Sequence, residues 1–234
     1  MTREGIAASR RVRIQHLERL LRDQVTDPLR KAVLDGIFSP GDRLTQRKLI
    51  ELTGVSRTSL REGLQQLQAE GLVEPAPRRG LQVILLTETA LAELYEVREY
   101  LESAAAELFI ANASDDQVAT LAQQLTVADC DDGAGSPSSN FYGYLFASAG
   151  NTLLRRIYES ITARIVMIQN LSIRSPGRAA ESRREVEQTL AWIRVRDSGR
   201  AVDATCHHVR MAKQSALHAL RTKTRHPPKG HRPD

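Results

Sequence analysis

Cysteines, aromatic residues and long apolar runs are all scarce in this chain. Two cysteines and one tryptophan occur in 234 residues, and aromatic residues make up 4%. Cys130 and Cys206 match no metal-binding or redox spacing, so we expect ordinary thiols in a reducing compartment. No run of about 18 apolar residues is present, and the N-terminus lacks the apolar core of a secretion signal. We therefore expect a cytoplasmic protein with no membrane-spanning helix, long enough for two domains.

Charge is distributed unevenly along the sequence. Residues 1–80 hold 15 Lys+Arg against 10 Asp+Glu, residues 81–220 hold 13 against 17, and residues 221–234 hold 5 against 1. The first third of the chain is basic and residues 81–220 are slightly acidic, which indicates that the first third binds a polyanion. The last 14 residues are basic, rich in proline and aperiodic, so we expect a disordered tail over 221–234.

One stretch in the basic third, residues 54–71, reads GVSRTSLREGLQQLQAEG. Ser56 is a good helix N-cap, which places Arg57 at the first helical position. Leucines at i, i+4 and i+7, beginning at Leu60, form one apolar stripe. The opposite side of this predicted helix carries donor-rich side chains, which are Arg57, Thr58, Arg61, Gln65 and Gln68.

The sequence on either side completes a winged helix-turn-helix pattern. A helix begins near residue 25 and ends at Gly36, and Ser-Pro-Gly at 39–41 makes a turn. Thr45 is expected to cap a second, short helix that stops at Gly54. After the third helix, short strands over 72–74 and 81–85 flank a tight turn that carries Arg78 and Arg79. Such a pattern places one helix in the DNA major groove and the wing near phosphates or the minor groove.

Arginine at the start of the third helix suits base recognition. An arginine can bond O6 and N7 of guanine in a bidentate manner, and hydroxyl and N–H groups at a helix N-terminus suit a phosphate. The alternative is that Arg57 and Arg61 only pair with acidic side chains on a solvated helix. The capped helix pair and the basic wing around them favour DNA binding.

The stretch PGDRLTQRKLIELTGVSRTSLREGLQQLQAEGLVEPAPRRGLQV resembles the DNA-binding domain of GntR-family transcriptional regulators. The resemblance covers about residues 23–85 and implies a winged helix-turn-helix domain over 23–86. It also implies DNA contacts by Arg47, Arg57, Thr58, Ser59, Arg61, Arg79 and Gly80. Residues 1–22 carry six arginines and lie outside the family pattern. They form either a DNA-contacting arm or a solvated leader, and we expect the leader.

From residue 87 onward the apolar periodicity is helical throughout. One predicted stripe runs through Leu91, Leu94, Val97, Leu101, Ala105 and Leu108, and another through Ile157, Ile161, Ile165 and Ile168. Later helices are expected at about 138–149, 152–172, 178–197 and 199–220. We therefore predict a mainly α protein, in which an antiparallel all-helical bundle over 87–220 follows the winged helix-turn-helix.

The stretches YEVREYLESAAAE and LFASAGNTLLRRIYESITARI resemble the FadR-type (FCD) C-terminal domain of GntR regulators. That resemblance implies a pocket that often holds a divalent metal, bound by one Asp and three His. The matching positions here are Ser138, Tyr142, Val186 and His208. One imidazole with a serine, a phenol and an isopropyl group is a poor metal site, so we expect no metal and no other cofactor.

Two arginines flank the predicted apolar stripes of the bundle. Arg98 and Arg164 each sit three or four residues from core positions, and a guanidinium near a core needs an anionic partner. One interpretation is an anionic effector, such as a carboxylate, held by Arg98 or Arg164 with Tyr142 and His208 nearby. The other is an internal ion pair, for example between Arg98 and Glu102. Trp192 is most simply a packing residue.

These observations together predict an effector-responsive, sequence-specific transcriptional regulator. We expect a repressor that binds a palindromic operator as a homodimer, because two recognition helices in successive major grooves read a short palindrome. An architectural protein that binds DNA without sequence preference is the alternative. We expect no enzyme, because no nucleophile–base pair or carboxylate pair stands at a convincing spacing.

Overall fold

The computed structural model describes residues 25–78, 80–127, 137–172 and 177–225. The chain divides into two compact units, residues 1–85 and 86–234. The expected leader over 1–22, Cys130, Arg79 and the last nine residues of the tail lie outside the described residues. Within the described ranges, no helix is long and apolar enough to cross a membrane.

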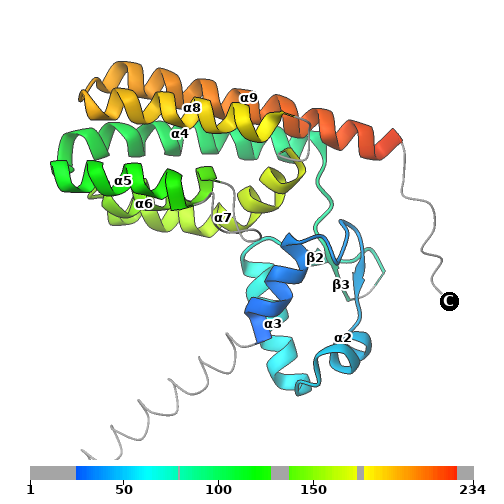
Figure 1. Ribbon diagram of the computed structural model, residues 1–234. Helices are drawn as coiled ribbons and strands as arrows, with labels where there is room; N and C mark the ends of the chain where they lie inside the picture. Colours follow the sequence, from blue (N-terminus) through cyan, green and yellow to red (C-terminus); the bar gives the residue numbers. More distant parts are fainter. Residues whose placement is uncertain (1–24, 79, 128–136, 173–176, 226–234) are drawn as a thin grey trace, which may run out of the picture. The chain divides into compact units, whose positions relative to one another are not determined.

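The first unit is three helices with a small sheet. Its first helix covers 25–34 in the described part, and the labelled elements are β1 (Arg43–Leu44), α2 (Gln46–Thr53), α3 (Arg57–Ala69), β2 (Val73–Pro75) and β3 (Leu81–Val83) (Figure 1). The antiparallel sheet has the order β1-β3-β2. The wing formed by β2 and β3 was predicted, but β1 was not, because two residues are too few to show an alternating pattern.

A close contact fixes α3 against the first helix. Leu60, Leu64 and Leu67 are buried as the spacing predicted. A Cβ at Gly63 would lie only 3.3 Å from Val25 Cγ1, so the missing side chain lets the two helices approach closely. The buried side of α3 is thereby fixed, and its opposite side faces away from the unit's core.

The two predicted N-caps of this unit differ. The Ser56 hydroxyl accepts a hydrogen bond from the Ser59 amide at 3.1 Å, which confirms Ser56 as the cap of α3. Thr45 occupies the N-cap position of α2 with extended backbone angles, but its side chain makes no capping hydrogen bond. The prediction that the second helix begins after Thr45 is therefore confirmed, but the side-chain hydrogen bond that usually accompanies such a cap is absent.

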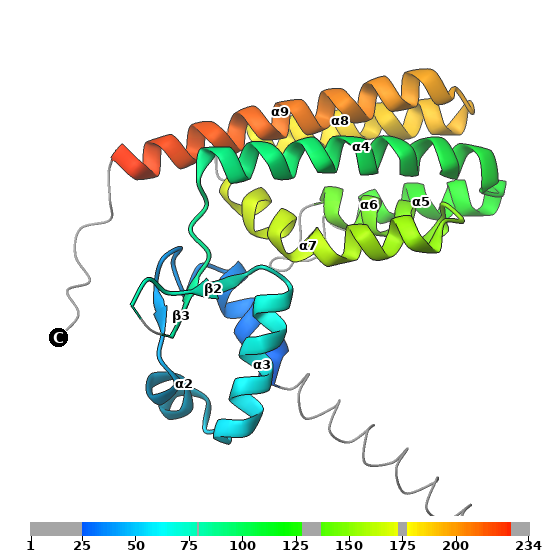
Figure 2. The ribbon, with the colours of Figure 1, turned by 180° about the vertical axis from the view of Figure 1, so that it is seen from behind.

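The second unit is an all-helical bundle, so the predicted fold class is confirmed. Its helices are α4 (Glu88–Asn112), α5 (Asp115–Val127), α6 (Pro137–Ser148), α7 (Thr152–Ser172), α8 (Arg178–Arg194) and α9 (Ser198–Arg225). The long helices α4 and α9 pack side by side along much of their length, and α8 lies against α9 (Figures 1 and 2). Helix α9 continues to Arg225, five residues into the segment that was expected to be disordered.

Two predicted core positions of the bundle are in fact exposed. Val97 on α4 is 46% exposed and Ile157 on α7 is 43% exposed. The buried face of α4 instead includes Arg98 and Glu102 next to Leu91 and Ala105. Periodicity assigned the core face from apolar residues alone. The error arose because two charged side chains that neutralise each other are buried there.

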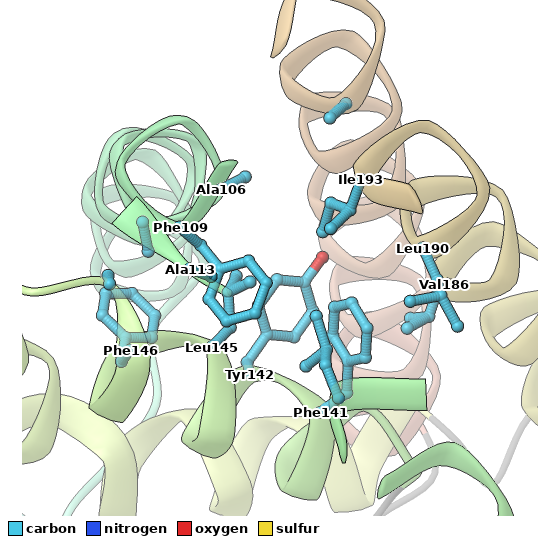
Figure 3. Close-up of a cluster of buried hydrophobic side chains, with 14 of the residues drawn as sticks. Ala106, Phe109, Ala113, Phe141, Tyr142, Leu145, Phe146, Val186, Leu190 and Ile193 are labelled. Atoms are coloured by element: carbon cyan, nitrogen blue, oxygen red, sulfur yellow. The ribbon is translucent and has the colours of Figure 1, made fainter. Parts of the chain in front are cut away.

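An extended apolar cluster takes buried residues from all six helices of the second unit. Phe141, Tyr142, Leu145 and Phe146 of α6 meet Phe109 of α4 (Figure 3). Val186, Leu190 and Ile193 of α8 belong to the same cluster. The Tyr142 hydroxyl is the oxygen within this otherwise hydrocarbon environment (Figure 3). Tyr142 therefore brings a polar atom into the apolar core.

Candidate functional site

The N-terminal turns of α3 present the predicted base-reading side chains. Arg57, Thr58 and Arg61 are exposed. Neither arginine forms an ion pair or hydrogen bond within the part of the chain that the structure describes. Their alternative role as partners of nearby carboxylates therefore has no support among these residues. Both guanidinium groups remain available to an external acceptor.

Ser59 is arranged differently from its neighbours on α3. It is half-buried, its amide donates to Ser56 Oγ, and the two hydroxyl oxygens lie 2.9 Å apart. A phosphate contact by Ser59 thus has to compete with the helix cap. Arg57 and Thr58, which are exposed at the positive end of the helix dipole, have no such competition from the cap.

The wing forms a tight turn between β2 and β3. The Ala76 amide donates to the Gly80 carbonyl at 3.0 Å, and Gly80 has φ of +91°, which a side chain would strain. Arg78 is exposed at this turn, and Arg79 lies outside the described residues. No neighbouring atom lies within 4 Å of a Cβ built at Gly80, so the turn is open to a close approach.

Two further basic residues of the first unit are exposed. Arg47 on α2 has a side chain that is 91% exposed and lies 3.7 Å from Glu51. Arg43, which sequence reasoning missed, is exposed on β1 and pairs in register with Gln82 of β3. Only the pairing of β1 with the wing strand brings Arg43 onto the same sheet, and the local sequence gave no sign of that pairing.

A buried polar network lies at the centre of the helical unit. Arg98 and Glu102, one helical turn apart on α4, form an ion pair with 2.5 Å between Nε and Oε1, and their side chains are 2% and 0% exposed. Arg98 Nη2 lies 3.4 Å from Nε2 of His208 on α9. The predicted alternative of an internal Arg98–Glu102 pair is therefore realised, and the pair connects directly to His208.

The second half of the network joins α8 to α9. Arg178 donates two hydrogen bonds to Glu185, at 2.6 and 2.7 Å, and Glu185 lies 2.8 Å from His208 Nδ1. Sequence reasoning missed both Arg178 and Glu185. A sign in the sequence could have indicated this pair. Arg178 and Glu185 carry opposite charges and lie two helical turns apart, on the side of α8 that also carries Ser182 and Val186.

The surroundings of His208 favour its neutral form. Burial and the neighbouring Arg98 charge lower the pKa of His208, although Glu185 opposes this. A neutral ring with its proton on Nδ1 can donate to Glu185 and accept from Arg98 through Nε2. Burial alone would raise the pKa of Glu185, but hydrogen bonds from His208 and Arg178 hold it below its usual value.

Several polar groups around Arg98 are buried without a hydrogen bond among the described residues. They are Arg98 Nη1 and the hydroxyls of Tyr95 and Tyr142. The Arg98 guanidinium carbon lies 5.5 Å from the Tyr95 ring centroid and 6.0 Å from that of Tyr142, so these groups belong to one cluster. The Tyr142 ring also stacks on His208 at 5.7 Å. Buried donors without acceptors cost free energy, which an incoming acceptor would recover.

The space beside this cluster is small and mostly apolar. It is lined by Leu94, Tyr95, Arg98, Ile165 and Ile168, and it leaves no room for a water molecule. Three of the four predicted effector residues, Arg98, Tyr142 and His208, come together in the polar cluster, and of these Arg98 also lines the space. The fourth, Arg164, is half-buried on α7 and shares no hydrogen bond or ring contact with them in the described ranges.

The residues at the family's metal positions do not fit a divalent cation. Val186 offers no ligand atom and lies in the apolar cluster, and the Ser138 side chain lies outside the described residues. Both ring nitrogens of His208 are engaged, and the Arg98 charge beside Nε2 would repel a cation. Among described residues no group of three or more His, Cys, Asp or Glu is placed to hold a metal. The absence of a metal stays a prediction.

Comparison with known proteins identifies both units. Residues 21–83 match the model described as "Bacterial regulatory proteins, gntR family", and residues 93–211 match that of the FCD domain. An HTH-type transcriptional regulator of Bacillus subtilis, YdhC, is 34% identical over 102 residues, 44% of this chain and 46% of the relative. The gluconate operon transcriptional repressor of Bacillus licheniformis is 35% identical over 80 residues, which make up 34% of this chain and 32% of that relative. In both cases the match spans less than half of the relative's length.

The fold also has a solved counterpart. A crystal structure of a transcriptional regulator from Rhodococcus sp. RHA1 matches with a TM-score of 0.71 at 21% identity, over 84% of this chain and 97% of that one. Regulators of this family bind DNA, their FCD domains bind small-molecule effectors, and they typically dimerise. They are not enzymes. With a gntR-type DNA-binding domain followed by an FCD domain that spans half of its length, the chain belongs to the GntR family of bacterial transcriptional regulators.

Proposed function

We propose that this regulator is a cytoplasmic repressor that binds a palindromic operator as a homodimer. The supporting observation is the pair of exposed, unpartnered arginines on the first two turns of a capped α3. In this proposal Arg57 and Arg61 read guanines in the major groove, and Thr58 and Ser59 contact the adjacent phosphates. Arg47, Arg79 and Gly80 hold the DNA backbone. The relationship to an operon repressor supports repression as the direction of control.

The proposed effector is a small organic anion, such as a carboxylate, that binds at Arg98. The unpartnered Arg98 Nη1 and the Tyr95 and Tyr142 hydroxyls supply donors, and His208 fixes the orientation of the guanidinium. Arg164 would join the site only if α7 moves. The space beside Arg98 leaves no room for a water molecule, so entry of the anion requires the helices around it to separate. This requirement couples effector binding to the shape of the bundle.

The DNA part of the proposal is tested with Arg57→Ala and a set of operators that each carry one base change. A bidentate contact predicts a loss of about 1–3 kcal/mol that disappears when the contacted base pair is already changed. A uniform loss across all operators would make Arg57 a phosphate contact instead. A wild-type protein that binds operator and random duplex equally would indicate the architectural alternative.

The effector part is tested by thermal-shift screening of small carboxylates with matched tyrosine variants. Tyr142→Phe removes a buried hydroxyl of the cluster, whereas Tyr100→Phe removes one from a side chain that is 79% exposed. We expect Tyr142→Phe to weaken the response to the effector and Tyr100→Phe to leave it unchanged. Equal responses from both variants would exclude the Tyr142 hydroxyl from the site.

A further inference from the structure

An open pocket of about 300 Å³ lies between α8 and α9. The two helices run side by side (Figure 1). Glu185, Gln188 and Trp192 follow one another at one-turn spacing on α8, and Arg200 and Asp203 line the pocket from α9. The volume is at the lower end of the range for small-molecule sites. None of the described residues that line this pocket also lines the space of the proposed effector site, so the two are separate.

The aromatic wall of the pocket is the single tryptophan of the chain. Trp192 is half-buried and packs partly against the apolar cluster of the bundle. The Arg200 guanidinium carbon lies 4.7 Å from the centroid of the Trp192 ring, which is a cation–π contact. The ring therefore already accepts a guanidinium, which the chain itself supplies.

Arg200 is held only loosely over this ring. Its side chain is 65% exposed, and its Nε lies 3.6 Å from Oδ2 of Asp197. The guanidinium donates no hydrogen bond within the described ranges, and the 3.0 Å hydrogen bond to Asp197 comes from the Arg200 backbone amide. Exposed ion pairs of this kind contribute little to stability. An external cation can therefore take the place of Arg200 over the ring.

The two carboxylates that line the pocket differ in their partners. Glu185 accepts two hydrogen bonds from Arg178 and lies 2.8 Å from His208 Nδ1, so it is satisfied within the chain. Asp203 is exposed and forms no hydrogen bond or ion pair with another described residue. It lies three residues after Arg200, on the same side of α9. The Asp203 carboxylate is therefore left to pair with a cation from outside the chain.

We propose that the α8–α9 pocket binds a small organic cation that carries a guanidinium group on a short apolar chain. The bound guanidinium replaces that of Arg200 over the Trp192 ring and pairs with Asp203. Charge favours a cation over an anion, because Arg200 is balanced by Asp197, whereas the negative charge of Asp203 has no partner among the described residues. Glu185 belongs both to this pocket and to the buried polar network, so the bound cation lies next to that network.

Three probes of similar length test the pocket in the full-length chain. They are butylguanidinium, its neutral isostere butylurea, and the anion pentanoate, each titrated at constant ionic strength. The readouts are the emission of Trp192 and the NMR signal of its indole N–H, which belong to this pocket alone because the chain has one tryptophan. We expect a saturable change with butylguanidinium at a dissociation constant of about 1 mM. Butylurea should bind at least about threefold more weakly, and pentanoate should give no saturable change.

Matched variants identify the groups that recognise the cation. Asp203→Asn should raise the dissociation constant of butylguanidinium about twofold or more, because the pairing charge is lost. Arg200→Ala should lower the constant about two- to fivefold, because the competing internal cation is gone. Glu93→Gln on α4 and Arg221→Ala near the end of α9 remove the same kinds of charge outside the pocket, and both should leave the constant unchanged. Circular dichroism confirms that each variant is folded.

Four results would overturn the proposal. No saturable change of either signal with butylguanidinium would exclude the site. Equal binding of butylguanidinium and butylurea would show a pocket that does not recognise charge. Weaker binding of butylguanidinium by Arg200→Ala would show that Arg200 holds the ligand and is not displaced by it. Saturable binding of pentanoate that Arg200→Ala abolishes would make the pocket an anion site. The measurements need neither operator DNA nor the anionic effector, so a failure of the proposed function is distinguished from a failure here.

Discussion

The arginines of the two units differ in exposure and in their partners. Arg57 and Arg61 of the first unit are exposed and lack a protein partner among the described residues, whereas Arg98 and Arg178 of the second are buried and paired with Glu102 and Glu185. Water stabilises an exposed guanidinium until DNA replaces it, so the first unit can keep its binding groups free. A buried guanidinium without a partner would destabilise the fold. The second unit therefore has to supply internal anions that an effector must rearrange.

Removing one anion from the buried network gives the largest expected effect. Glu102→Ala leaves the Arg98 guanidinium, 2% exposed, without its carboxylate, and we expect a loss of about 3–5 kcal/mol in the free energy of unfolding. Glu159→Ala removes an exposed partner of Arg155 and should cost under about 1 kcal/mol. Urea unfolding of both variants measures the difference. Equal losses would show that the network contributes no more than a surface pair.

Acidification is expected to destabilise the second unit through His208. Its folded pKa is lowered by burial, so the unfolded chain takes up a proton first as the pH falls below about 6.5. Stability is therefore complete above that pH and decreases below it, by about 1.4 kcal/mol for each unit of pKa depression, until the folded group also titrates. Melting curves between neutral and mildly acidic pH measure this loss. His208→Gln should flatten the profile, and the exposed His218→Gln should not; identical profiles would exclude His208.

The comparison also explains how far the sequence could predict the molecule. Caps, apolar stripes and a Pro-Gly turn are local features, and they predicted α3, the wing and the exposed arginines correctly. The strand β1 and the Glu185–His208 contact depend on residues far apart in sequence, so no local pattern could reveal them. Val97 was expected in the core but is 46% exposed, whereas Arg98 is buried because Glu102, one turn away, neutralises it, as one of the two alternatives for Arg98 had predicted. Apolar periodicity cannot show which charged pairs a core accepts.

The caps of the first unit allow a smaller test within that unit. Ser56→Ala removes the hydroxyl that accepts from the Ser59 amide, and we expect a loss of about 1 kcal/mol in unfolding free energy. Thr45→Ala should cost less, because the Thr45 side chain makes no capping bond. Chemical denaturation measures both. A larger effect at Thr45 would mean that its hydroxyl caps α2 in solution.

The smallest expected change in stability belongs to the residues with the largest proposed role in DNA binding. The double substitution Arg57→Ala and Arg61→Ala removes two exposed side chains that bond to no described residue, so the unfolding free energy should stay within about 0.5 kcal/mol of the wild type. Operator affinity should fall, because each bidentate base contact contributes about 1–3 kcal/mol. Denaturation and operator titration on the same samples give both values. A variant that loses stability together with affinity would show that these arginines also support the fold. Separate effects would mean that the first unit can change its operator without losing stability, whereas the second cannot change Arg98 or Glu102 without weakening its core.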